Sequence, residues 1–144
     1  MREIREVIFR GKRTDCEAWA EGDLLHYESG EMAICKGFSK YGYEATEIIG
    51  RYKVIPETVG QYTGLTDKNG VRIFEGDIVR YAERRLGGED VSVAFPVTFD
   101  EGGFCAHHYF LNNWLRNGLG GNTKLEDIEV IGNIHDNPEL LQKI

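Results

Sequence analysis

The residues best able to do chemistry in this sequence lie together in the stretch DEGGFCAHHYF. Two acids, one cysteine and two histidines fall within nine residues: Asp100, Glu101, Cys105, His107 and His108. Thiolate, imidazole and carboxylate are the ligands that zinc prefers. The spacing argues against such a site, because successive strand residues point to opposite faces and His108 would point away from Cys105 and His107. We therefore predict no metal site here.

The same stretch also offers a nucleophile and a base. A Cys105 thiol activated by His108 is conceivable, since catalytic partners are joined by the fold rather than by the sequence. Nothing singles this pair out, and the glycine-rich pieces of the chain lack the spacing of phosphate-binding loops. The sequence predicts no catalytic residue, no cofactor and no enzyme. It leaves open whether Cys105, His107 and His108 do anything.

Composition limits the classes of protein to which the chain can belong. Its 144 residues are 41% apolar and 28% charged, which fits a single domain over residues 1–144. No apolar run approaches the roughly 20 residues needed to cross a bilayer, and the N-terminal MREIREVIFRGKR lacks the apolar core of a secretory signal. The three cysteines, an odd number at wide spacing, suit buried free thiols. We expect a cytoplasmic protein.

Short β segments separated by glycine dominate the pattern. The clearest is VSVAFPVTF, Val91–Phe99, whose valines and phenylalanines alternate with small or polar residues. Pro96 cannot donate a ladder hydrogen bond, so we predict an edge strand or a bulge there. Helical signals are few: HHYFLNNWLRNGLGG predicts a short helix ending at Gly118, and NPELLQKI a short terminal helix or turn. The remaining predicted strands are Val7–Arg10, Glu17–Ala20, Leu24–Tyr27, Met32–Lys36, Glu47–Val54, Gly60–Leu65, Val71–Phe74, Ile78–Ala82 and Ile128–His135.

Two tight turns follow each other in QYTGLTDKNGVRIFEGDIVRY. In TDKNG, Asp67 can start a type I turn and Gly70 can take the left-handed conformation that closes a hairpin. In EGDIV, Gly76 is free in φ and Asp77 can accept hydrogen bonds from backbone amides. We interpret all four as structural turn residues, with Gly70 and Gly76 at positive φ.

Parts of the chain repeat. EGDLLHY, Glu21–Tyr27, matches EGDIVRY, Glu75–Tyr81, and TEIIGRY, Thr46–Tyr52, resembles IEVIGNI, Ile128–Ile134. The intervals differ, so the pattern is not that of a fixed-period repeat array. Two related turn-and-strand pieces, halves of one barrel-like sheet, would explain it, and so would coincidence.

Net charge bears on the class of partner. At −7 the chain is poorly suited to non-specific binding of a phosphate backbone, which lysine and arginine clusters drive. Aromatic residues nevertheless alternate with bases and could form a base-stacking face: Arg51, Tyr52, Lys53, Arg80 and Tyr81. A polar outer strand face explains them as well. A non-enzymatic module that binds a protein partner or itself is the favoured function, a nucleic-acid-binding small barrel the alternative, and an enzyme of unknown class the third.

One apolar run suggests self-association. Large side chains after residue 108 exceed what one small β domain readily covers. We expect part of this surface, Tyr109, Phe110 and Trp114, to be buried against a symmetry-related copy, since closed homo-oligomers commonly hide such patches. The alternative is that a short helix folds back on its own sheet.

Several long motifs resemble one known family. PETVGQYTGLTDKNGVRIFEGDIVRY and EVIGNIHDNPELL, with FRGKR near the start, are similar to the YopX family of phage and prophage proteins, nearly end to end. The resemblance implies a mainly β fold, a twisted antiparallel sheet with the character of a small Src-homology-type barrel and one or two short helices. It further implies homo-oligomers in the cytoplasm of an infected or lysogenic bacterium, and no known activity. The Cys105, His107 and His108 cluster lies where the resemblance is thin and inherits no role.

Overall fold

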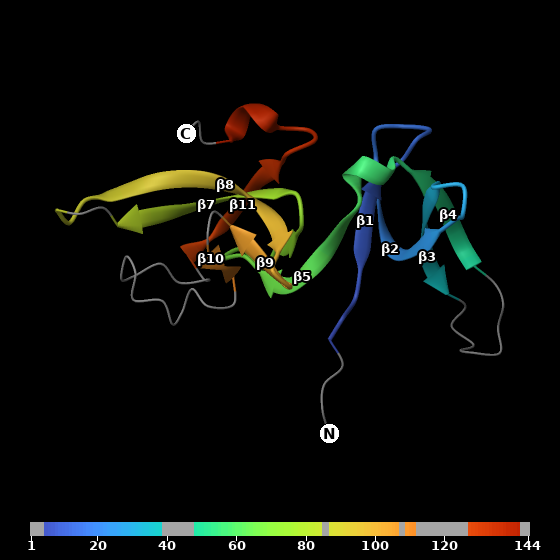
Figure 1. Ribbon diagram of the computed structural model, residues 1–144, viewed down its shortest axis with the longest axis horizontal. Coiled ribbons are helices and arrows are strands. Elements are labelled where there is room, and N and C mark those ends of the chain that lie inside the picture. The colour runs from blue at the N-terminus through green and yellow to red at the C-terminus, as the bar shows by residue number, and fades with distance from the viewer. Residues whose placement is uncertain (1–4, 39–47, 85–86, 107–108, 112–126, 142–144) are drawn as a thin grey trace, which may run out of the picture. The chain divides into compact units, whose positions relative to one another are not determined.

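The computed structural model describes residues 5–38, 48–84, 87–106, 109–111 and 127–141. Within them the chain forms two compact units, unit 1 over Met1–Tyr62 and unit 2 over Thr63–Ile144 (Figure 1). Every strand pair whose register is defined is antiparallel. The prediction of a single domain over residues 1–144 stays a prediction.

Unit 1 is a curled sheet. Strands β4 (Ile48–Val54), β3 (Met32–Phe38), β2 (Trp19–His26) and β1 (Phe9–Lys12) follow in that order, and β1 also pairs with the start of β5 (Gly60–Thr66). Apolar side chains from alternate positions fill the concave side, with Ala20, Ile34 and Val54 fully enclosed. Alternation along each strand thus places one row of residues in the core and the next on the outer surface.

The two ends of this sheet approach each other. Arg13 and Val54 form an isolated bridge, and the Ile55 amide donates to the Lys12 carbonyl over 2.8 Å. Gly11 permits the approach, because a β carbon there would lie 2.9 Å from the β carbon of Val54. A 3-10 turn, η1 (Pro56–Thr58), then leads into β5. The sheet therefore curls toward a barrel without closing into one.

Unit 2 has a five-stranded sheet in the order β10-β9-β8-β7-β11. Its strands are β7 (Asp77–Arg84), β8 (Asp90–Asp100), β9 (Gly103–Ala106), β10 (Tyr109–Phe110) and β11 (Glu129–Asn133). The short β6 (Arg72–Phe74) pairs with β5, and a 3-10 turn, η4 (Pro138–Leu140), follows β11. The core includes Ile73, Val79, Tyr81, Val93, Phe95, Val97, Ala106, Leu111 and Ile128.

The predicted fold class is confirmed: the protein is mainly β, and its described residues form antiparallel sheets and short helical turns. The closed form of a barrel is absent from the described strands, whose sheets keep open edges. Among the described residues, no helix combines the length and apolar character that crossing a bilayer requires. The predicted alternation of Val91–Phe99 places Val93, Phe95 and Val97 in the core.

The register agrees with the prediction for Pro96, whereas the helix prediction needs correction. Among the described residues, Asp90–Pro96 of β8 pair with β7 and Val97–Asp100 pair with β9, so Pro96 has no ladder partner on its second side. Proline is tolerated there since the ladder with β7 extends to Pro96 and the ladder with β9 starts at Val97. The helix predicted around Phe110 is wrong at its start, where Tyr109–Phe110 is strand β10 paired with β9. The rest of that segment, residues 112–126, lies outside the described residues.

Candidate functional site

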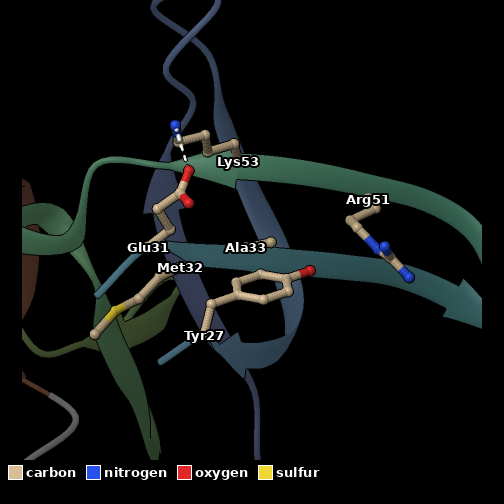
Figure 2. Close-up of a pocket in the computed structure, with 6 residues that line it drawn as sticks. All are labelled: Tyr27, Glu31, Met32, Ala33, Arg51 and Lys53. Atoms are coloured by element: carbon tan, nitrogen blue, oxygen red, sulfur yellow. Dashed lines mark ion pairs between the residues drawn. The ribbon is translucent and has the colours of Figure 1, made fainter. Parts of the chain in front are cut away.

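A pocket on the outer face of unit 1 is a candidate functional site. It lies over β3 and is lined by Tyr27, Glu31, Met32, Ala33, Arg51 and Lys53 (Figure 2). A tight turn between β2 and β3 positions the first two, with the Tyr27 amide donating to the Glu31 carbonyl over 3.0 Å. Gly30, at φ +92°, supplies the conformation that closes this turn.

Strand register assembles the rest of the pocket. Ala33 is opposite Lys53 on β4 and opposite Leu25 on β2, while Cys35 is opposite Arg51. Residues directly opposite share a face of the sheet, so two small side chains on the middle strand lie between longer ones on its neighbours. Ala33 is 4% exposed and lines the floor of the pocket, and Cys35, on the same face of β3, is 2% exposed. The difference in side-chain length produces the hollow.

An ion pair closes one side of the pocket. The Lys53 ammonium lies 2.7 Å from the Glu31 carboxylate, as the dashed line in Figure 2 marks, and Glu31 also accepts from the Ser29 hydroxyl over 3.0 Å. Hydrogen bonding to Lys53, then to Ser29, lowers the pKa of Glu31. Both side chains are more than half exposed, so the pair contributes little to stability and mainly orients the two groups.

Arg51 lies on the other side of the pocket. Within the described part of the chain, the Arg51 guanidinium has no ion pair or side-chain hydrogen bond, although it lines the pocket with Tyr27. The Tyr27 side chain is 43% exposed, and in Figure 2 its ring lies along β3 with the hydroxyl toward the Arg51 end. The pocket has a volume of about 300 Å³, room for one or two side chains. Its chemistry is an apolar surface with one available cation.

The predicted nucleic-acid face divides between the two sides of its strands. In unit 1, Arg51 and Lys53 are on the outer face, whereas Tyr52 between them packs against the core and lies under the Arg13 guanidinium at 4.3 Å. In unit 2, Arg80 is exposed and forms an ion pair with Glu129 at 2.8 Å. Tyr81 is 6% exposed in the core, so its ring is not available to stack on a base.

Only part of the cysteine and histidine cluster falls within the described residues. His107 and His108 lie outside them. Cys105 is buried on β9, and its thiol lies 3.7 Å from the Gly103 carbonyl oxygen and 3.9 Å from that of Asp100. Burial raises the pKa of this thiol, and the charges of Asp100 and Glu101 raise it further. The environment of Cys105 thus favours the unreactive protonated form.

The four predicted turn residues occupy two turns of unit 2. Gly70 and Gly76 have φ values of +79° and +92°, the positive values expected from the sequence. The buried Asp77 carboxylate accepts from the Phe74 amide over 2.7 Å, and the Gly76 amide donates to the Val97 carbonyl over 2.8 Å. These contacts join the turn to the neighbouring strand β8.

Asp67 acts beyond its own turn. Its Oδ1 accepts from the Asn69 and Val71 amides over 2.8 and 2.9 Å, and its Oδ2 accepts from the amide of Val130 on β11 over 2.9 Å. Burial opposes ionisation of this carboxyl, but the three amide donors outweigh it and the pKa lies below the ordinary value. Sequence reasoning found the turn and missed the bond to β11, for which the sequence holds no local signal.

The predicted self-association surface lies largely outside the described residues. Trp114 lies outside the described residues, and only the backbone of Tyr109 and Phe110 is described. Burial of these side chains against a second copy stays a prediction.

Four lining residues of the pocket, Tyr27, Glu31, Met32 and Ala33, were not singled out from the sequence. The hairpin turn at Gly30 was the available signal, because its register places Ala33 opposite Leu25. The pairing of β3 with β4 had no such signal, since nine residues, 39–47, separate the two strands in sequence.

Comparison with known proteins identifies the family. The crystal structure of protein EF1440 from Enterococcus faecalis is similar, with a TM-score of 0.61 and 33% sequence identity over 95% of this chain and 99% of that one. No curated protein sequence matches the chain. The sequence model of the YopX family, described as YopX protein, matches residues 8–142. The chain therefore belongs to the YopX family.

Proposed function

We propose that this protein is a non-enzymatic accessory module that acts by binding another protein, and that the pocket over β3 is its binding site. The observation that carries the proposal is the arrangement in that pocket. An exposed tyrosine ring and an apolar floor lie beside Arg51, a cation with no counterion among the described residues. Exposed aromatic and arginine side chains are the types most often responsible for affinity in protein interfaces.

The chemistry of the pocket supports binding rather than catalysis. Glu31 is its single acid, and that carboxylate is held by Lys53 with a lowered pKa, which makes it a poor general base. Among the described residues, no group of three or more His, Cys, Asp and Glu side chains could hold a metal ion. These features favour a site that recognises a surface.

Nucleic-acid binding is the alternative and receives less support. Tyr81 is buried and Tyr52 packs against the core, while Arg80 and Lys53 are paired with Glu129 and Glu31. Four of the five predicted residues are therefore not available in the required form. The net charge of −7 also opposes a polyanionic partner.

The biological setting is part of the proposal. The resemblance to phage and prophage proteins supports an origin in a phage or prophage, with the protein acting in the cytoplasm of the bacterial host. Its partner would be a phage or host protein, and a homo-oligomer is the expected form.

Selection from a library of displayed random peptides tests the binding function. The wild-type chain should enrich peptides, and enrichment should be lost when Tyr27→Ala and Arg51→Ala are combined. Lys36→Ala is the matched control, since Lys36 is an exposed base on β3 that alternates to the opposite face from Ala33 and Cys35. Failure to enrich any peptide, or enrichment that survives the double substitution, would count against the proposed site.

A further inference from the structure

The arrangement of charges around the pocket limits the ligand to one anionic group. On the outer face of the sheet, side chains directly opposite each other on neighbouring strands form three successive rows, here called levels. Tyr27 and Glu31 form the first, Ala33 and Lys53 the second, and Cys35 and Arg51 the third. Lys53 is already paired with Glu31, so among the described residues that line the pocket Arg51 is the cation left for a ligand. A single carboxylate suits it, because guanidinium and carboxylate form paired hydrogen bonds.

Two acids stand at opposite ends of this face. Glu31 is at the first level, and Asp23 is opposite Cys35 at the third, two strands from Arg51 and so roughly 10 Å away. A ligand with one negative charge at Arg51 avoids both, whereas a chain of phosphates would meet one or the other. The surface therefore favours an isolated acidic side chain over nucleic acid.

The distance along β3 between the apolar part of the pocket and Arg51 is set by the spacing of residues in the strand. Levels are two residues apart, roughly 6.6 Å along the strand, and the Tyr27 ring extends from the first level toward the third (Figure 2). An extended peptide lying along β3 points every second side chain to the same side. An apolar side chain over Tyr27 would thus be two or four positions from an acid at Arg51.

We propose that the pocket over β3 binds an extended segment of a partner protein in which a Glu or Asp pairs with Arg51 and an apolar side chain two or four positions away packs on the Tyr27 ring. This inference rests on the proposed function and adds the chemistry of the partner. Lys53, held by its ion pair with Glu31, then does not compete with Arg51 for the acidic side chain of the ligand.

Short peptides test this on the full chain labelled with ¹⁵N. Four acetylated and amidated probes contain one Leu and one Glu, separated by one, two, three or four positions in a Ser and Gly background, and each has a twin with Gln in place of Glu. Peptide titrations follow the amide signals of Ala33, Arg51 and Lys53. We expect the probes with separations of two and four to bind at least about fivefold more tightly than their Gln twins. The other two separations should show no such preference.

Variants locate the effect. Arg51→Gln should abolish the preference for Glu over Gln, and Lys36→Gln, the same charge change on the opposite face of β3, should preserve it. Equal binding of each Glu probe and its twin to the unmodified protein would overturn the inference, whether or not the Arg51 variant folds. Equal preference at all four separations would also overturn it, as would a single-stranded oligonucleotide that shifts the same signals more strongly than any peptide.

The outcomes separate this inference from the proposed function. If Gln and Glu peptides bind equally well and Tyr27→Ala weakens both, the pocket is a protein-binding site that does not select acids. If no probe shifts the pocket signals at millimolar concentration, the acidic segment is excluded. The displayed-peptide selection then decides whether the pocket binds protein at all.

Discussion

The tripeptide Glu-Gly-Asp occurs once in each unit and has two different structures. In unit 2 it forms the turn before β7, with Gly76 at φ +92° and Asp77 only 2% exposed. In unit 1 it lies inside β2, where Gly22 pairs with Phe9 and Asp23 is exposed. Neighbouring strands, not the tripeptide, decide between these structures. The carbonyl of Val97 accepts from the Gly76 amide in one unit, and the carbonyl of Cys35 lies against Gly22 in the other.

The second repeat shows the same divergence. TEIIGRY contributes β4 and IEVIGNI contributes β11, but β4 is separated from β2 by β3, whereas β11 pairs directly with β7. The similar segments therefore do not occupy equivalent places in the two sheets, and the interpretation of two equivalent halves of one barrel-like sheet is not supported.

Replacing the aspartate of each tripeptide, Asp77 and Asp23, should give the largest difference in stability between the two units. Asp77→Ala leaves the Phe74 amide without that acceptor in a buried site and should lower the free energy of unfolding by about 2–3 kcal/mol. Asp23→Ala, at an exposed position in the matching segment, should leave the urea midpoint within the scatter of repeated measurements. Similar losses for both variants would show that the comparison is mistaken.

Substitution of the glycine of each tripeptide, Gly22 and Gly76, should be destabilising for different reasons. A β carbon on Gly22 would overlap the Cys35 carbonyl oxygen, so Gly22→Ala should force β2 and β3 apart at a cost of about 1–3 kcal/mol. Gly76→Ala should cost about 1–2 kcal/mol through its left-handed backbone alone. Hydrogen exchange distinguishes them: faster exchange should be confined to β2 and β3 for the first substitution and to the turn before β7 for the second.

Lowering the pH should destabilise unit 2, because Asp67 becomes protonated. Its pKa is lowered in the folded protein, so at pH values between the folded and unfolded pKa the unfolded chain binds more protons. The stabilisation is present above the ordinary aspartate pKa of about 3.9 and is lost as pH falls through the lowered folded value. The protection of the Val130 amide against exchange, relative to the intrinsic rate at each pH, should fall in this range in the wild type. The Asp67→Asn variant should be less stable than the wild type at neutral pH and should lose less stability as the pH falls. An identical pH profile of exchange in the variant and the wild type would exclude Asp67 as the cause.

The smallest effect is expected for the exposed ion pair of unit 1. Glu31→Gln removes the partner of Lys53 at a site where both side chains are more than half in solvent, and the urea midpoint should not move measurably. A clear loss of stability would mean that the Glu31–Lys53 ion pair stabilises unit 1, contrary to its assignment as a surface feature.

Residues within one turn or strand were predictable from the sequence. The turns at Gly70 and Gly76 and the alternation of Val91–Phe99 depend on φ preferences and on a two-residue period, both local properties. Contacts between distant segments were not. The Asp67 bond to Val130 joins residues 63 positions apart, and the pocket over β3 depends on the register with β4. The strand β10 was mistaken for helix because an apolar pair such as Tyr109–Phe110 fits either period.

The bond from Asp67 to Val130 also bears on the order of folding during synthesis. All residues of unit 1 have been made once Tyr62 is added, whereas unit 2 lacks a strand of its sheet until β11 emerges. At about 5–20 residues per second, roughly 3–13 seconds separate the synthesis of Asp67 from that of Val130. From the synthesis of Arg84, the last residue of β7, until β11 is made, the edge of β7 that β11 will occupy lacks that strand, so the newly made chain exposes unpaired backbone groups that the finished protein covers.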